Sequence, residues 1–150
     1  MRMGKGELNR SLPDGKCAPP TIQIVSPHLS SIRVRYAESD QMGVAHHASY
    51  IPWLEEARIE WLRAHDRSYR QLETEGVFMP VTEMTVRYRR SLRFDDVATL
   101  TTTATATGPT RICFATRVMH GDILCAEAEV TVAAVNAAGK PLRIPAGLLG

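Results

Sequence analysis

The sequence predicts an α+β domain in which one long helix lies across the concave face of a strongly curved antiparallel sheet of about five strands. Apolar side chains recur at steps of three and four through residues 49–64, which is the spacing of a wide helix face. Segments typical of strands lie before this helix, at residues 31–36, and after it, within residues 77–135. The order strand, helix and about four strands favours a single layered domain.

Residues 1–30 are expected to form a flexible N-terminal extension, outside a domain of residues 31–146. They are rich in Gly, Pro, Ser and Lys, a composition that buries little apolar surface. In the segment that follows, Ile32, Val34 and Tyr36 alternate with Ser and Arg side chains. This alternation predicts a first strand with one covered face.

The long helix is expected to begin at Ser49. Pro52 lacks an N–H and its ring collides with the preceding turn, so a helix that contains it must begin within about four residues before it. Serine is a favoured N-cap residue at such a start. The face expected to be buried consists of Tyr50, Leu54, Ala57, Trp61 and Ala64, with Ile51, Trp53 and Leu62 beside them.

A short second helix and four strands are expected after the long helix. Ser68 followed by Gln71 is typical of a capping box, and Gly76 is expected to end this short helix. Gly121 and Asp122 predict a tight hairpin reversal. The strands are expected at residues 77–90, 97–107, 111–120 and 123–135, with a short final pairing at residues 142–144.

Composition limits the classes of function. The 150 residues, 44% hydrophobic and 23% charged, provide one domain with a single core, and a net charge of +2 does not favour nucleic acid as the partner. No apolar run approaches the roughly 18–20 residues of a membrane span, and a secretory signal is not recognisable. The three cysteines, an odd number without metal-ligand spacing, fit a reducing compartment and argue against a disulfide framework. The sequence therefore predicts a cytoplasmic protein.

The densest set of reactive side chains lies in the loop that leads into the long helix. This loop places Asp40, His46 and His47 beside a helix N-terminus, where several backbone N–H groups have no partner within the helix. A carboxylate and free amides held close together can hydrolyse an acyl bond, since one attacks or activates water and the others bind the oxyanion. Gly43 would supply the positive φ of a turn that folds Asp40 back over the helix end. The alternative role for Asp40 is an Asx-turn or capping carboxylate.

The same stretch resembles the 4-hydroxybenzoyl-CoA thioesterase family, and within it the YbgC-like acyl-CoA thioesterase branch. A second run, residues 84–96, resembles another landmark of that family, and the resemblance covers residues 32–145. It departs at His46, where relatives usually carry an aromatic or apolar residue. The pattern that carries the resemblance is Tyr36, Asp40, Gly43, Val44, His47, Tyr50, Glu55, Ala57 and Arg58.

The resemblance implies a hotdog fold, dimers that pair into tetramers, and hydrolysis of an acyl-CoA thioester without a metal or other cofactor. It implies that Asp40 acts as nucleophile or general base, that amides near His47 bind the oxyanion, and that Tyr36 lines the acyl pocket. An acyl carrier protein thioester is an alternative substrate to acyl-CoA. The residues expected to bind substrate are Gly43, Val44, His46, Tyr50, Arg89 and Arg90.

The basic run around Arg89 and Arg90 has two interpretations. Together with Arg87 and Arg93 it would hold the phosphates of coenzyme A, or its members are solvated residues at strand ends. Arg87 and Arg89 share one face of a strand and Arg90 takes the other, so all four cannot act together.

Several other hypotheses stay open from the sequence. The two histidines and Asp40 permit a hotdog dehydratase acting on a 3-hydroxyacyl thioester, and the same cleft permits a non-catalytic acyl-thioester binding module. A metal site is disfavoured because a third ligand at suitable spacing is missing. Glu55 and Glu56 are reserve candidates for the catalytic carboxylate, although Glu55 and Arg58, three residues apart, more simply form an intrahelical ion pair.

Overall fold

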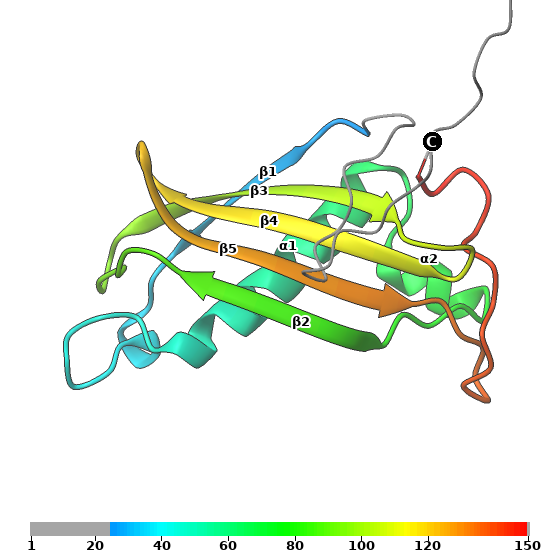
Figure 1. Ribbon diagram of the computed structural model, residues 1–150, viewed down its shortest axis with the longest axis horizontal. Helices are drawn as coiled ribbons and strands as arrows, with labels where there is room; N and C mark the ends of the chain where they lie inside the picture. The colour runs from blue at the N-terminus through cyan, green and yellow to red at the C-terminus, as the bar shows by residue number, and fades with distance from the viewer. Residues whose placement is uncertain (1–24, 150) are drawn as a thin grey trace, which may run out of the picture.

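The computed structural model describes residues 25–149, and most of the expected N-terminal extension, residues 1–24, lies outside the described part of the chain (Figure 1). The helical elements are η1 (Tyr36–Glu38) and η2 (His47–Ser49), both 3-10 helices, then α1 (Tyr50–Ala64) and α2 (Tyr69–Thr74). The strands are β1 (His28–Arg33), β2 (Val81–Tyr88), β3 (Val97–Ala106), β4 (Arg111–His120) and β5 (Ile123–Ala133).

One antiparallel sheet of five strands, in the order β1, β3, β4, β5, β2, curves around α1 (Figure 1). The α+β prediction, with one long helix against a curved antiparallel sheet, is therefore confirmed. The first strand begins at His28 and ends at Arg33, earlier than residues 31–36, because Arg35 to Glu38 turn into η1 instead of continuing the ladder. β2 also ends early, at Tyr88, because the amides of Arg89 and Arg90 both donate to the carbonyl of Cys125 and break its ladder.

The core lies between α1 and the sheet. Trp61, which is fully buried, packs edge-on against Phe114 of β4 with ring centroids 5.6 Å apart. The predicted face was wrong for Ile51, which is 45% exposed, and for Ala64, which is exposed at the last turn of the helix. The buried residues of α1 are Tyr50, Trp53, Leu54, Ala57, Trp61 and Leu62.

The start of α1 differs from the prediction. Ser49 has helical dihedral angles and makes no capping hydrogen bond, because η2 leads directly into α1 and moves the first helical turn upstream. The cap is His46, whose Nδ1 accepts from the amide of Ala48 at 3.1 Å. The Ser49 hydroxyl instead donates to the carbonyl of Glu38 at 3.0 Å. Helical backbone therefore begins at His47, inside the predicted site.

The elements after α1 follow the predicted order, but β2 begins at Val81 instead of residue 77, and in place of the expected final pairing at residues 142–144 there is a single bridge between Val135 and Pro141. Ser68 and Gln71 form the expected capping box, and Gly76 adopts the expected positive φ after α2. Leu148, beyond the expected domain end at residue 146, is 1% exposed and packs into the core. Cys113, buried on β4, is disulfide-bonded, so the argument against disulfides was wrong at this position.

Candidate active site

Asp40 lies in a tight turn that its own carboxylate closes. Its amide donates to the carbonyl of Val44 at 2.9 Å, and its carbonyl accepts from the amide of Gly43 at 3.0 Å. Oδ1 accepts from the amide of Met42 at 2.8 Å, which is an Asx-turn. Gly43 has φ +75°, the positive value that this turn was expected to require. The carboxylate is half-buried, and within residues 25–149 its Oδ2 has no hydrogen bond or ion pair.

His47 is the first residue of the helical segment that continues into α1. Within residues 25–149 its amide N–H has no acceptor, whereas the amide of Ala48 is capped by His46 and that of Ser49 donates to the His46 carbonyl. The carbonyl of His47 accepts from the Tyr88 hydroxyl at 2.8 Å, so β2 fixes this turn. A helix N-terminus with one unpaired amide is suited to binding a developing oxyanion.

Glu38 is a buried carboxylate that the sequence analysis did not single out. It is 8% exposed, and its Oε1 accepts from the indole N–H of Trp53 at 3.0 Å and from two nitrogens of Arg35. Its carbonyl accepts from the His46 amide at 2.7 Å and from the Ser49 hydroxyl. Glu38 therefore ties the loop to both the start and the second turn of the helix. An acid three residues from an arginine resembles an ordinary surface pair, so little in the sequence signals this role.

The pKa of Glu38 reflects two opposing effects. Burial raises the pKa of this carboxyl, but the hydrogen bonds from Arg35 and Trp53 outweigh burial and hold the pKa below its usual value of 4.5. The ionised form is thus favoured in the folded protein. Its contribution to stability is present above the pKa of the unfolded chain and is lost as the pH falls through the folded pKa.

Replacing Glu38 by Ala is expected to destabilise the protein. The buried indole N–H of Trp53 would lose its acceptor, which costs about 1–3 kcal/mol of unfolding free energy. Glu38→Gln keeps an acceptor oxygen and is the matched control, with a smaller loss. Urea unfolding at several pH values tests this: below pH 4.5 the wild type should lose stability more steeply than Glu38→Gln. Equal pH dependence in the two proteins would contradict the role of the ionised carboxylate.

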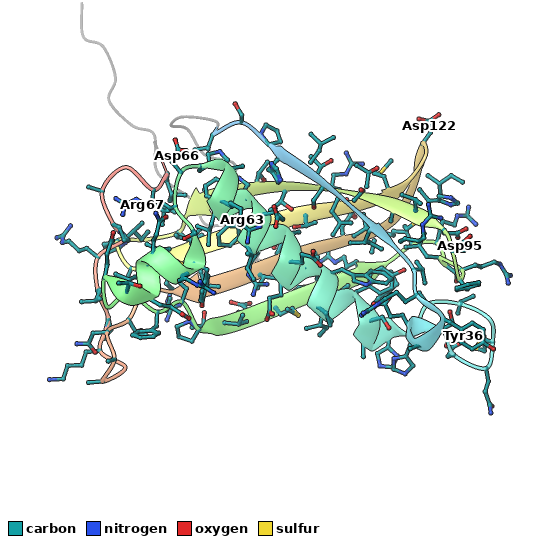
Figure 2. All side chains as sticks on the ribbon, turned by 180° about the vertical axis from the view of Figure 1, so that it is seen from behind. Tyr36, Arg63, Asp66, Arg67, Asp95 and Asp122 are labelled. Carbon is teal, nitrogen blue, oxygen red and sulfur yellow. The ribbon has the colours of Figure 1, made fainter. Side chains whose placement is uncertain are left out.

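The remaining predicted residues of the loop lie in different surroundings. Tyr36 is 80% exposed and packs edge-on against Phe94, with centroids 5.4 Å apart; within residues 25–149 it makes no hydrogen bond to Asp40 (Figure 2). Tyr50 is buried against Trp53 and Tyr88, and burial raises the pKa of its hydroxyl to about 12. The Tyr50 hydroxyl therefore stays neutral, and its ring packs in the core at the start of α1. Val44 is half-buried in the Asp40 turn.

The basic run divides into paired and unpaired members. Arg89 forms a 3.1 Å ion pair with Glu127, whereas the guanidinium of Arg93 lies against the Asp40 turn, where a Cβ at Gly43 would be 3.6 Å from its Nη1. Arg90 and Arg93 are exposed and form no ion pair within residues 25–149. Arg93, which the sequence analysis considered only as a member of the basic run, is therefore the arginine that approaches this turn at Gly43.

Two cavities are lined by residues outside the Asp40 loop: one lies between α1, α2 and the sheet, and the other lies beside Tyr69 of α2, residues 78–80 and residues 135–137. The more enclosed, of about 170 Å³, is lined by side chains of α1, α2 and the sheet, including Glu55, Arg58 and Tyr69. The expected ion pair between Glu55 and Arg58 is absent within residues 25–149. Figure 2 shows the regions at the two ends of α1: Tyr36 and Asp95 lie toward its N-terminal end, and Arg63, Asp66 and Arg67 lie at its C-terminal end.

Within residues 25–149, no group of three or more His, Cys, Asp or Glu side chains is placed to hold a metal ion. No helix in this part of the chain is long and apolar enough to cross a membrane.

Comparison with known proteins is consistent with this geometry. The chain is 37% identical over 120 residues to an acyl-CoA thioester hydrolase, YbgC, of Escherichia coli, an alignment that covers 79% of this chain and 90% of that protein. Its fold superposes with a TM-score of 0.76 on a structure from Bartonella henselae described as a probable thioesterase, at 30% identity and covering 80% and 100% of the two chains.

A DHNA-CoA thioesterase from Staphylococcus aureus superposes with a TM-score of 0.75, at 26% identity and covering 79% and 81% of the two chains. These findings confirm the hotdog fold, the resemblance to YbgC-like proteins and, at the level of the family, the prediction of a thioester hydrolase. The family model described as the thioesterase-like superfamily matches residues 34–150, and the chain belongs to that superfamily.

Proposed function

We propose that this protein hydrolyses acyl-CoA thioesters, with Asp40 as the reactive carboxylate and the His47 amide as an oxyanion donor. The observation that carries the proposal is their joint placement on one short loop. Within residues 25–149, Asp40 has one oxygen bonded to its own turn and the other unpaired, a few residues before a helix N-terminus whose His47 N–H has no acceptor. A fixed carboxylate and a preorganised donor are the two parts that acyl transfer to water requires.

Two routes are compatible with this arrangement. As a nucleophile, Oδ2 of Asp40 would attack the thioester carbonyl carbon and expel the thiolate of coenzyme A, and water would then hydrolyse the resulting anhydride. As a general base, the same oxygen would take a proton from water as the water oxygen attacks that carbon. In both routes the carbonyl oxygen becomes negative and accepts from the His47 N–H. Both routes yield a carboxylic acid and free coenzyme A.

The remaining predicted site residues take supporting roles in the proposal. Gly43 and Val44 make the backbone hydrogen bonds that close the Asp40 turn, and His46 caps the start of the helix. Tyr50 packs against Trp53 in the first turn of α1. Tyr36, with its exposed ring, would border the acyl group.

Arginines near the turn are proposed to bind the phosphates of coenzyme A. Arg90 and Arg93 form no ion pair within residues 25–149 and can do so, whereas Arg89 would first have to break its ion pair with Glu127. Replacing both Arg90 and Arg93 by Ala should raise KM for acyl-CoA at least about fivefold and leave kcat nearly unchanged. Arg111 is an exposed arginine at the first position of β4, so Arg111→Ala is the matched control and should behave as wild type.

An acyl-pantetheine substrate, which lacks the nucleotide phosphates, should show the same KM with wild type and with the double arginine variant. An equal rise in KM for both substrates would contradict phosphate binding by these side chains.

The reaction class is tested by a panel of acyl-CoAs of different chain length and ring content, assayed with a thiol-reactive dye. Free coenzyme A should appear in proportion to carboxylic acid. An enoyl thioester formed from a 3-hydroxyacyl substrate would instead indicate a dehydratase, and binding without turnover would indicate a binding module. Either result would contradict hydrolysis.

We propose that the protein assembles as a dimer or tetramer through the β2 edge of the sheet. β2 is an edge strand with Val81 45% exposed and Tyr88 49% exposed, and uncovered edges favour pairing with another chain. Light scattering of the purified protein would measure the mass, and a monomer at micromolar concentration would contradict this assembly. The cytoplasmic location stays a prediction from the sequence.

A further inference from the structure

His46 makes three hydrogen bonds at the start of the helical segment that continues into α1. Its amide donates to the carbonyl of Glu38 at 2.7 Å, and its carbonyl accepts from the amide of Ser49 at 2.9 Å. Its ring nitrogen Nδ1 accepts from the amide of Ala48 at 3.1 Å. Two of the next three amides in the chain are therefore satisfied by His46 itself. The third, that of His47, has no acceptor within residues 25–149.

The peptide group that joins His47 to Ala48 is held at both sides. Its carbonyl accepts from the Tyr88 hydroxyl at 2.8 Å, and its N–H donates to the His46 ring. The preceding peptide group carries the His47 N–H and is held at its carbonyl by the Ser49 amide. Loss of the bond to the His46 ring would therefore leave the unpaired N–H on a turn that fewer contacts fix.

The bond from Ala48 defines the protonation state of the His46 ring. An imidazole nitrogen accepts a hydrogen bond only when it carries no proton, so the single proton of the neutral ring lies on Nε2. The ring is exposed to solvent. An imidazole takes up a proton between about pH 5 and 8, and Nδ1 of the protonated ring is a donor. The protonated ring therefore cannot accept from the Ala48 amide.

The surroundings of His46 offer no compensation for a positive charge. The N-terminal end of a helix carries a partial positive charge, and the His47 ring lies beside the His46 ring with centroids 4.1 Å apart. Within residues 25–149, no carboxylate forms an ion pair with His46. The other ionisable groups around this turn contact other partners: Glu38 binds Arg35 and the Trp53 indole, Asp40 accepts from the Met42 amide, the Tyr88 hydroxyl donates to the His47 carbonyl, and Arg93 lies against Gly43.

We propose, on the basis of the thioester hydrolysis proposed above, that His46 is a positioning residue: its neutral imidazole holds the Ala48 amide and thereby keeps the His47 amide in place for the oxyanion. His46 then acts through the backbone instead of contacting the substrate. When its ring takes up a proton, the cap is lost and the first helical turn can rearrange. Turnover falls because the oxyanion donor is less well oriented, whereas binding of coenzyme A changes little.

Two variants at position 46 separate the cap from the ring. His46→Ala removes the acceptor, so kcat at pH 8 should fall at least about fivefold, with KM within about twofold of wild type. Asparagine is a favoured N-cap residue, and its side-chain oxygen can accept from the same amide without a titrating ring. His46→Asn should therefore recover most of the kcat that His46→Ala loses. Equal losses in the two variants would overturn the proposal, because turnover would then require the ring itself.

The pH dependence of kcat distinguishes a titrating cap from a purely structural contact. The cap is present while the His46 ring is neutral and is lost as the pH falls and the ring takes up a proton. The ratio of kcat in His46→Asn to kcat in wild type should therefore rise at least about fivefold between pH 8 and pH 5. Any effect of Asp40 protonation is common to both proteins and cancels in this ratio.

His28→Asn is the matched control for the pH profile. His28 is the first residue of β1, at the opposite end of that strand from the Asp40 loop. The ratio of kcat in His28→Asn to kcat in wild type should stay constant between pH 8 and pH 5. A ratio for His46→Asn that is equally constant would overturn the proposal.

NMR of the protein without substrate tests the cap separately from activity. At pH 8 the His46 ring should carry its proton on Nε2, and on acidification the Ala48 amide signal should move with the same midpoint as that ring. This movement should be absent in His46→Asn. A proton on Nδ1 at pH 8, or an Ala48 signal that ignores the titration, would overturn the proposal. Coupled signals in a protein that releases no coenzyme A would instead contradict the proposed function, and with it the catalytic role of the cap.

Discussion

Asp40→Asn is expected to lower kcat for acyl-CoA hydrolysis by about a hundredfold to ten-thousandfold, with the fold intact. The amide oxygen of Asn can still accept from the Met42 amide, so the turn and the position of the side chain should persist. The variant lacks the negative oxygen that would attack the thioester or take a proton from water, and such groups typically contribute factors of this size. Thiol release measures the loss, and thermal unfolding checks the fold.

Asp66→Asn is the matched control for this substitution. Asp66 is exposed, lies in a turn at the opposite end of α1 with φ +59°, and Asn tolerates that conformation as well as Asp does (Figure 2). It should keep full activity. If Asp40→Asn turns over acyl-CoA within a few-fold of the wild-type rate, Asp40 is not the catalytic carboxylate. Glu55 and Glu56 would then be the candidates for that role.

His47→Pro is expected to lower kcat by about a hundredfold or more, because proline removes the unpaired amide that would bind the oxyanion. The position accepts proline sterically. It is the first residue of a helical segment, where proline is favoured, and the preceding His46 has φ −61° and ψ 139°, the extended backbone that precedes proline. The Tyr88 hydroxyl can still donate to the carbonyl of residue 47. Binding of acyl-CoA should change little.

His47→Ala separates the amide from the imidazole. It keeps the N–H and removes the ring, which packs against the His46 ring with centroids 4.1 Å apart. If the amide is the oxyanion donor, this variant should retain most of the wild-type kcat. A similar loss in His47→Ala and His47→Pro would instead assign the catalytic role to the imidazole, as leaving-group acid or substrate contact.

The fold could be predicted because its determinants are local and periodic. The alternation in the strands, the capping box at Ser68 and the three- and four-residue steps of α1 each act over a short stretch of chain. The start of the helix could not be predicted in this way. Ser49 and His46 are both capable caps, and the carbonyl of Glu38, eleven positions before Ser49 in the chain, accepts from the Ser49 hydroxyl.

The site could be predicted only in part, for a similar reason. The Asp40 turn depends on residues within five positions of one another, so its geometry followed from the sequence. The contact of Trp53 with Glu38 joins residues fifteen positions apart, and the approach of Arg93 to Gly43 joins a loop to the segment before β3. Such contacts arise from the packing of the helix on the sheet, which no local pattern encodes.

The proposed mechanism requires that the Asp40 carboxylate and the His47 amide contact the same thioester. A crystal structure of Asp40→Asn with an intact acyl-CoA would test this most directly. The carbonyl oxygen should lie about 2.7–3.1 Å from the His47 nitrogen, and the carbonyl carbon about 3–3.5 Å from the side chain at position 40. A thioester bound elsewhere, for example with its carbonyl in the cavity beside Arg58, would contradict this mechanism.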